Sequence, residues 1–370
     1  MKILALDLGK YKTVFCDYVT GYVTDHVTAG AGAGAGQCGY GKVPTAPKDL
    51  HDLLVERRPD RVVLEAGPAA GWVHDLAAAL GAEVQVANTN DERWQWKRAK
   101  KKTDRVDALK LAQMSAMGCL PTVHVPAPRV RQWRSLIEYR HALVDRRTAV
   151  KNSIRAIFDR QGLRLPSGHR AWTAAGVAQI GKDARPLAEC GPLELWRGQL
   201  HVELEALRAA EQQVREVEQK LDALAAEDER VRRLRTAPCV GPRLSEVVAA
   251  VLDEPRRFRT AKQVGAYAGL SPRQWQSGNS RRDGHVSRAG NPVLRELLVE
   301  VSWLGVRSVP WMRDAYERVR RGSDKRKKIA IVAVARRLLV RLWAMLRDGA
   351  EWRDQGPHHQ DPPPREAVPA

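Results

Sequence analysis

The residues that follow Met1 constrain the fold most strongly. Residues 2–8 (KILALDL) form an apolar run that ends at Gly9, which predicts a half-buried strand leading into a turn. Residues 13–19 are its expected hairpin partner. Downstream, the pattern predicts a helix at 47–57, a strand at 61–65 (RVVLE), a helix at 69–80 and a strand at 83–87. This order of elements predicts an α/β domain with a mixed sheet.

Two long helical patterns follow this domain. Apolar residues recur at helical spacing from Val130 to Phe158, and again, close to a heptad repeat, from Leu200 to Val231. Both patterns suit a coiled-coil arm that pairs or oligomerises. The alternative is a helical connector that has no partner.

The remaining sequence divides into an arginine-rich region and a tail. A break at Ala237-Pro238 opens a region for which we expect short helices, and the segment TAPCVGPRLSEVVAAVL resembles a helix-hairpin-helix that binds DNA backbone. The last stretch contains PHHQDPPPREAVPA and is expected to be disordered. The predicted domains are therefore 1–125, a helical connector at 126–235, a third domain at 236–348 and a tail at 349–370.

The net charge of the chain indicates the kind of molecule that it binds. Its 370 residues include 62 Lys and Arg against 43 Asp and Glu, a formal net charge of +19. Such a basic excess indicates a polyanionic partner, and we favour nucleic acid over a membrane surface. The apolar stretch 329–335 stops at Arg336, which makes it too short to span a bilayer. No signal peptide is recognised, and five scattered cysteines suit a reducing cytoplasm.

Four acidic residues fall where a catalytic site collects in an α/β sheet. Asp7 closes the first predicted strand and Glu65 closes the strand RVVLE, whereas Asp104 and Asp107 begin a predicted helix with Thr103 as its N-cap. Residues three apart share one face of a helix. Four carboxylates gathered together require a hard cation between them, and Mg²⁺ or Mn²⁺ prefers such an all-oxygen environment. Each residue also has a purely structural explanation, as a turn, pairing or helix-dipole residue.

A basic run interleaved with tryptophans lies directly before Asp104. Its composition suits a groove that follows a nucleic-acid backbone and offers stacking platforms. The expected contact residues here are Trp94, Trp96, Lys97, Arg98, Lys100, Lys101, Lys102 and Arg105.

A serine in the arginine-rich region is a candidate nucleophile. Ser277 lies in a predicted loop among arginines, and surrounding guanidinium groups would stabilise a phosphate under attack. A serine hydroxyl needs activation at neutral pH, so an ordinary turn residue is the alternative explanation. The arginines expected to contact nucleic acid are Arg273, Arg281, Arg282 and Arg288.

These motifs together resemble the DEDD insertion-sequence transposases, a family of bridge-RNA-guided serine recombinases. The resemblance rests on Asp7, on Glu65, on KKTDRVDALKLA, and on PCVGP, FRTAKQVGAYAGLSP, QSG and SRAGNPVLREL in the second half. It covers residues 1–345. It implies an RNase H-like (RuvC-like) N-terminal domain in which Asp7, Glu65, Asp104 and Asp107 bind Mg²⁺, with Mn²⁺ as a substitute. It also implies that Ser277 is the catalytic serine.

The resemblance further implies a mechanism and partners. Ser277 would attack DNA to form a phosphoserine link, and a free DNA hydroxyl would then displace the serine, exchanging strands without net hydrolysis. The implied partners are donor and target DNA, a structured guide (bridge) RNA and further copies of the chain in a dimer of dimers. The implied location is the bacterial cytoplasm at the nucleoid.

Two departures and three alternatives accompany this interpretation. Cys239 stands where the hairpin glycine is expected, and the Ala-Gly run at residues 29–36 has no counterpart. A RuvC-like junction-resolving nuclease would use the same carboxylates with water as nucleophile. An actin-like ATPase also opens with Leu-Asp-Leu-Gly, but it needs phosphate and adenosine motifs that we do not find. A non-enzymatic nucleic-acid-binding protein would satisfy the charge alone.

Overall fold

The structure is a computed structural model of the chain. It describes residues 1–20, 37–89, 91, 103–277, 280–287 and 289–353, and for residues 273–283 it describes the backbone only. The chain divides into two compact units, Met1–Pro128 and Arg129–Ala370. The four-part division expected from the sequence remains a prediction. No helix within the described residues combines the length and apolar character needed to cross a membrane.

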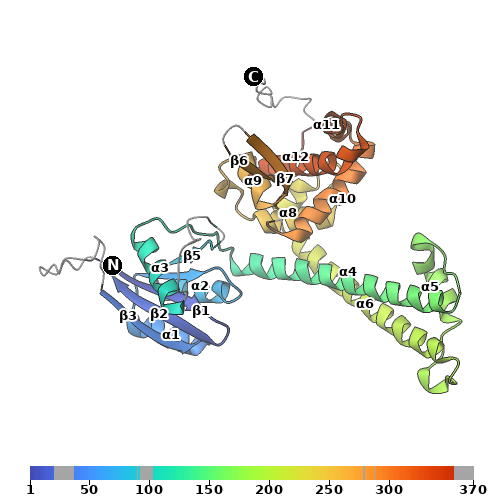
Figure 1. The fold of residues 1–370 in the computed structure, drawn as a ribbon, viewed down its shortest axis with the longest axis horizontal. Coiled ribbons are helices and arrows are strands. Elements are labelled where there is room, and N and C mark those ends of the chain that lie inside the picture. The colour runs from blue at the N-terminus through green and yellow to red at the C-terminus, as the bar shows by residue number, and fades with distance from the viewer. Residues whose placement is uncertain (21–36, 90, 92–102, 278–279, 288, 354–370) are drawn as a thin grey trace, which may run out of the picture. The chain divides into compact units, whose positions relative to one another are not determined.

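The first unit is a five-stranded mixed sheet with helices packed on it (Figure 1). The strand order is β3-β2-β1-β4-β5; β1, β2 and β3 pair antiparallel, and β4 and β5 continue the sheet parallel to β1. The mixed sheet fits the expected RNase H-like class. Its elements are β1 (Lys2–Leu8), β2 (Lys12–Val19), β3 (Gln37–Pro44), α1 (Pro47–Arg57), β4 (Arg61–Glu65), α2 (Ala70–Ala79), β5 (Glu83–Ala87) and α3 (Asp104–Ala116).

Two apolar layers cover the two faces of this sheet. On one face Leu4, Leu6, Val62 and Leu64 pack with residues of α1 and α2. On the other, the alternate residues of β1 and β4 pack with α3. Because strand side chains alternate between faces, the odd-numbered residues of β1 and β4 point to the side of the sheet on which α3 packs.

Strand β3 was not predicted from the sequence. Its residues are mostly exposed, and Gly39 and Gly41 weaken the strand pattern. Gly41 has a packing reason, because a Cβ there would lie 2.2 Å from the ring of Phe15 on β2. The Ala-Gly run at residues 29–36 lies outside the described residues.

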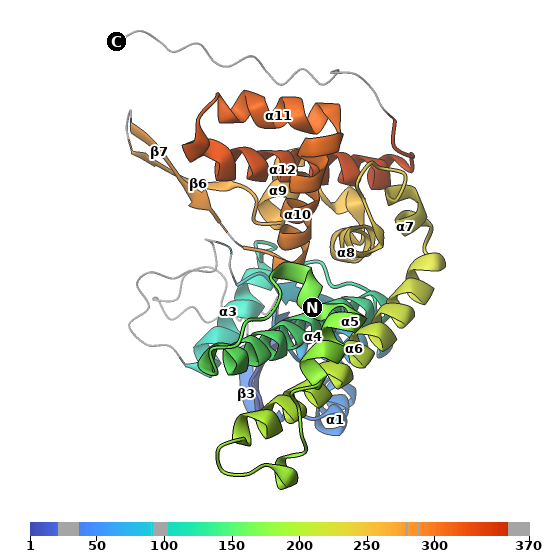
Figure 2. The ribbon, with the colours of Figure 1, turned by 90° about the vertical axis from the view of Figure 1, so that its right-hand side faces the viewer.

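The second unit begins with two long helices, α4 (Pro128–Arg160) and α6 (Leu195–Ala226), that run side by side (Figures 1 and 2). They are antiparallel, because Arg140 pairs with Glu218 whereas Ser153, farther along α4, hydrogen-bonds Glu203, nearer the start of α6. Helix α5 (Ala174–Gly181) and a short 3₁₀ turn, Gly168–Trp172, pack over the distal end, where Ile154, Ile180 and Leu204 share a core.

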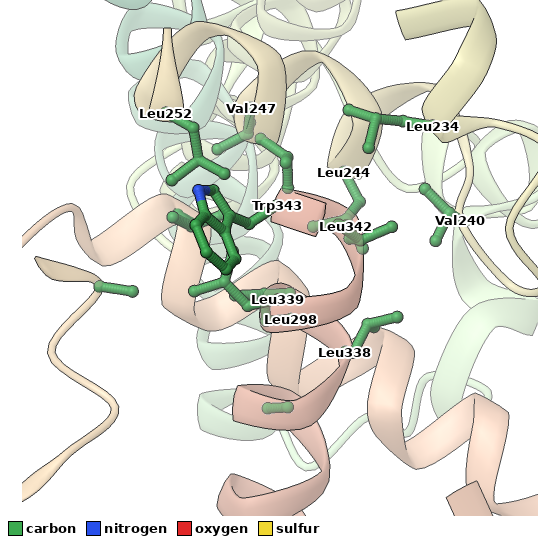
Figure 3. Close-up of a cluster of buried hydrophobic side chains, with 14 of the residues drawn as sticks. Leu234, Val240, Leu244, Val247, Leu252, Leu298, Leu338, Leu339, Leu342 and Trp343 are labelled. Atoms are coloured by element: carbon green, nitrogen blue, oxygen red, sulfur yellow. The ribbon is translucent and has the colours of Figure 1, made fainter. Parts of the chain in front are cut away.

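The rest of the second unit is mainly helical around α8 (Pro242–Leu252), in which every residue from Leu244 onward is buried. Figure 3 shows Leu244, Val247 and Leu252 of this helix packed against side chains from neighbouring helices. The remaining elements are α7 (Glu229–Leu234), α9 (Ala261–Tyr267), β6 (Pro272–Ser277), β7 (Ser280–Val286), α10 (Pro292–Ser308), α11 (Pro310–Arg320) and α12 (Lys327–Asp348), with 3₁₀ turns at Leu187–Glu189, Pro255–Arg257 and Asp324–Arg326.

The expectation of short helices in this region holds for α8, α9 and α11 but is wrong for α10 and α12, which have 17 and 22 residues. The β6–β7 hairpin was not predicted. In addition, the first residues of the predicted tail contact the second unit. Trp352 lies with its ring centroid 6.0 Å from that of Trp311, and its backbone N–H donates to the hydroxyl of Thr236.

Candidate active site

Asp7 is the next-to-last residue of β1, and Glu65 is the last residue of β4, the neighbouring parallel strand. The register pairs Leu6 of β1 with Leu64 of β4, and the two carboxylates belong to the next residue on each strand. Ile3 and Ala5 pack on α3, as does Val63. Since side chains alternate along a strand, Asp7 and Glu65 continue the same face and project toward the side of the sheet that α3 covers. Both are half-buried.

The direction of α3 brings its acidic start to these carboxylates. Arg61, the first residue of β4, donates from Nη1 to the backbone oxygen of Ser115 at 3.3 Å, near the end of α3. From this contact, Glu65 lies four residues along β4, about 13 Å at a strand's rise. Asp107 lies eight residues back along α3, about 12 Å at a helix's rise. The end of β4 and the first turn of α3 therefore lie at about the same distance from the Arg61–Ser115 contact, at one end of the sheet.

The start of α3 is fixed by the predicted cap. The Thr103 hydroxyl accepts a hydrogen bond from the backbone N–H of Val106 at 3.4 Å, so the helix begins at Asp104 as expected. Asp104 and Asp107 thus occupy the first turn, where the positive end of the helix dipole favours carboxylates. Asp107 is half-buried and Asp104 is exposed.

At the level of Asp7, paired residues of β1, β2 and β3 form a row across the sheet. Asp7 pairs with Val14, and Val14 pairs with Lys42 on β3. Lys12 lowers the pKa of Lys42, whereas the charge of Asp104 acts in the opposite direction. Asp104 therefore lies toward the β3 side of the row.

Lys110 is a positively charged residue of α3 on the side of the site nearer β4. It lies one helical turn after Asp107 on α3 and is 8% exposed. Burial lowers its pKa, whereas the charges of Asp107 and Glu65 act in the opposite direction. The ammonium group is therefore within electrostatic range of both carboxylates. Lys110 was not predicted from the sequence: its spacing from Asp107 places it on the same face of α3, but its burial depends on how α3 lies along β4.

The donor chemistry of the site suits a hard divalent cation, because carboxylate oxygens are the ligands that Mg²⁺ and Mn²⁺ prefer. The carboxylates are not close enough together to surround such a cation: within the described part of the chain, no three His, Cys, Asp or Glu side chains lie near enough to one another to hold a metal ion. The four carboxylates converge on one end of the sheet without forming a compact cluster.

Most of the expected nucleic-acid contacts cannot be placed. Trp94, Trp96, Lys97, Arg98, Lys100, Lys101 and Lys102 lie outside the described residues, as does Arg288. Arg105 is described: its guanidinium carbon lies 5.8 Å from the ring centroid of Tyr40 on β3. Arg273 lies on β6, and Arg281 and Arg282 lie on β7, where only their backbone is described.

Ser277 is the last residue of β6 rather than part of a loop, and it pairs with Ser280, the first residue of β7. Its side chain is not among those described. The hairpin belongs to the second unit, and the four carboxylates belong to the first. The sequence pattern missed the strand because β6 and β7 are polar and arginine-rich.

The turn before α8 explains one departure noted in the sequence. Cys239 has φ +62°, the left-handed conformation that glycine adopts readily and other residues adopt at a cost. The cysteine therefore occupies a backbone position with the geometry of a glycine. The thiol is exposed and lies 3.5 Å from the hydroxyl of Ser308.

Comparison with known proteins identifies the class. Residues 37–161 match a family model described as a transposase of the DEDD type, and residues 231–317 match one described as "Transposase IS116/IS110/IS902 family". The protein is a transposase, an enzyme of DNA recombination. It belongs to the IS110/IS116/IS902 family of insertion-sequence transposases, and this membership implies use of a divalent metal ion.

Relatives match over most of their length. A putative transposase of Sinorhizobium fredii is 31% identical over 317 residues, covering 79% of this chain and 78% of that one. A probable family 20 transposase of Pseudomonas aeruginosa is 30% identical and covers 80% and 87%. The transposase for insertion sequence element IS1111A of Coxiella burnetii is 26% identical and covers 77% of each.

A search of solved structures matched RuvC of Thermus thermophilus. The match covers 33% of this chain and 100% of RuvC, with 15% sequence identity and a TM-score of 0.23. At that score the likeness supports no conclusion about this chain.

Proposed function

We propose that this transposase exchanges DNA strands through a covalent phosphoserine intermediate at Ser277, in a reaction that depends on Mg²⁺ bound by Asp7, Glu65, Asp104 and Asp107. The observation that carries the metal site is the convergence of β1, β4 and the first turn of α3 at one end of the sheet. Bound there, a divalent cation would act as a Lewis acid toward a phosphate oxygen.

The chain's own residues perform the chemistry in two steps. The Ser277 hydroxyl oxygen attacks phosphorus and loses its proton to solvent, the bond from phosphorus to the leaving deoxyribose oxygen breaks, and that oxygen is protonated. A second DNA hydroxyl then attacks the same phosphorus, loses its proton, and releases Ser277, which is reprotonated. The number of phosphodiester bonds is unchanged, so rejoining needs no external energy source.

The proposal assigns partners as well. Donor and target DNA are the substrates, and a structured guide RNA selects them by base pairing, so the protein needs only backbone contacts. The antiparallel helices α4 and α6 are the surface through which we expect copies to pair as a coiled coil, giving a dimer of dimers. The α7–α8 segment serves as a helix-hairpin-helix that contacts DNA backbone. The reaction takes place in the cytoplasm, at the nucleoid.

The alternative is a junction-resolving nuclease that uses the same carboxylates with water as nucleophile. The two candidate mechanisms differ in their nucleophile, and only the first requires Ser277.

A strand-exchange assay with purified protein, Mg²⁺, the element's flanking RNA and labelled donor and target DNA tests the proposal. We expect Asp7→Asn and Ser277→Ala to abolish exchange. Ser280→Ala, which changes the residue paired with Ser277, and Asp49→Asn, in the first turn of α1, are the matched controls and should remain active. Exchange retained by Ser277→Ala would contradict the serine mechanism, and exchange retained by Asp7→Asn would contradict the metal site.

A further inference from the structure

Lys110 is a buried charge at the candidate metal site. Lysine is almost never fully buried without a partner, because removing an ammonium group from water is costly. Nearby residues of α3, Ala108, Leu111 and Ala112, pack in the apolar layer against the sheet. A lysine on this helix at 8% exposure therefore needs a specific electrostatic reason.

The geometry of α3 supplies that reason. Lys110 lies five residues before Ser115, the residue that contacts Arg61, and hence about 7.5 Å along the helix from that contact. Helical side chains lean toward the N-terminus of their helix. The long lysine chain therefore extends toward the level of Glu65 and Asp107, the two carboxylates whose charges act on its ammonium group.

We propose that Lys110 is a positioning residue that supplies the built-in countercharge of the carboxylate site, holding Asp107 and Glu65 in place while no metal is bound. The positive charge of the ammonium group screens the repulsion between the two carboxylates. A divalent cation that binds there takes over this role and must compete with the ammonium group. This inference rests on the proposed metal-dependent function and names a residue outside its four carboxylates.

The arrangement also accounts for the open spacing of the site. Two carboxylates that share an ammonium group need not approach each other closely.

Removal of the charge is the direct test. Lys110→Met and Lys110→Gln keep a side chain of similar length and remove the charge, whereas Lys110→Arg keeps it. Lys42→Met is the matched control, because Lys42 lies on the same sheet face near Asp104 but is exposed. Mn²⁺ affinity is measured on the full chain without DNA, by the electron paramagnetic resonance signal of free Mn²⁺, and Tm is measured with and without Mn²⁺.

We expect Lys110→Met and Lys110→Gln to bind Mn²⁺ about tenfold more tightly than the unchanged protein, since one competing charge is gone. Their Tm should fall in metal-free buffer and recover on saturation with Mn²⁺. Lys110→Arg and Lys42→Met should bind within about threefold of the unchanged protein.

The outcomes separate the inference from the proposed function. Unchanged or weaker Mn²⁺ affinity in both Lys110→Met and Lys110→Gln, together with loss of binding in Asp107→Asn, overturns the role of Lys110 and leaves the metal site standing. No Mn²⁺ binding by any form, the unchanged protein included, overturns the metal site and the countercharge with it.

Discussion

Arg61 donates to both the backbone oxygen and the hydroxyl of Ser115, at 3.3 and 3.2 Å, and this contact fixes how α3 lies on the sheet. The Ser115 hydroxyl in turn donates to Gln85 on β5 at 2.8 Å. Helix α3 is thereby tied at its C-terminal end to the start of β4 and to β5. Its acidic N-terminal end is consequently directed to the carboxyl ends of β1 and β4.

We therefore predict that Ser115→Ala lowers the free energy of unfolding by about 1–2 kcal/mol, because Ser115 is 1% exposed and its hydroxyl group links half-buried Arg61 to Gln85. Urea denaturation measures the change. Ser308→Ala is the control, since Ser308 is exposed and its hydroxyl contacts only the Leu304 carbonyl of its own helix and the exposed thiol of Cys239 among the described residues. This variant should stay within about 0.5 kcal/mol of the unchanged protein. Equal effects of the two substitutions would contradict the anchoring role.

The acidic first turn of α3 should matter for chemistry more than for stability. Asp104→Asn and Asp107→Asn are each expected to lower the rate of DNA cleavage at least about 100-fold, because each removes a charge that the proposed cation needs. Their cost in unfolding free energy should be below about 1 kcal/mol, the size of a helix-dipole interaction. Cleavage kinetics under single-turnover conditions and urea denaturation of the same preparations check both halves. A loss of activity that matches a loss of folding would refute this division.

Glu246 on α8 should make stability depend on pH. Its side chain is 1% exposed, 3.1 Å from Arg243, and burial raises its pKa from 4.5 to about 7. The other charged groups that act on it are Asp222 and Glu218 of α6 and Arg140 of α4. Between pH 4.5 and 7 the folded protein keeps a proton that the unfolded chain has released. Stability from this group therefore falls as pH rises through that window.

The corresponding experiment compares Glu246→Gln with the unchanged protein by urea denaturation at pH 5 and at pH 8. The glutamine does not titrate. From pH 5 to pH 8 the unfolding free energy of the unchanged protein should therefore fall by about 3 kcal/mol relative to that of Glu246→Gln. A difference that is the same at both pH values would show that Glu246 is ionised in the folded protein throughout.

The turn at Cys239 predicts a stabilising substitution. Cys239→Gly should raise the free energy of unfolding by about 0.5–1 kcal/mol, because glycine relieves the cost of φ +62°. Cys190 has φ −89°, so Cys190→Gly is the control and should lower stability through the entropy of the unfolded chain. Thermal denaturation of both variants gives the comparison. Destabilisation by Cys239→Gly would mean that the contact of its thiol with Ser308 outweighs backbone strain.

Sequence patterns predicted the first unit well where its residues are apolar. The expected strands and helices from β1 to β5 match the structure to within about a residue, β3 excepted, because burial on the sheet demands apolar runs such as RVVLE. Strand β3 escaped because it is an exposed edge strand and Gly41 is needed to admit the ring of Phe15. The hairpin β6–β7 escaped for the related reason that its residues are polar.

The candidate site was predictable in part. Asp7 and Glu65 could be placed because a strand's end is visible in the sequence, and Thr103 marked the start of α3. Lys110 could not be placed, because its burial depends on how far α3 slides along β4, which the contact between Arg61 and Ser115 determines. A tertiary contact of that kind leaves no periodic signal in the chain.

The most direct test of the account asks whether DNA becomes attached to the protein. Purified protein, Mg²⁺, the element's flanking RNA and a labelled DNA junction are combined, resolved on a denaturing gel, and any adduct is mapped by mass spectrometry. We predict a DNA adduct at Ser277 that disappears in Asp104→Asn. Cleaved DNA ends without an adduct would contradict the serine mechanism and establish water as the nucleophile.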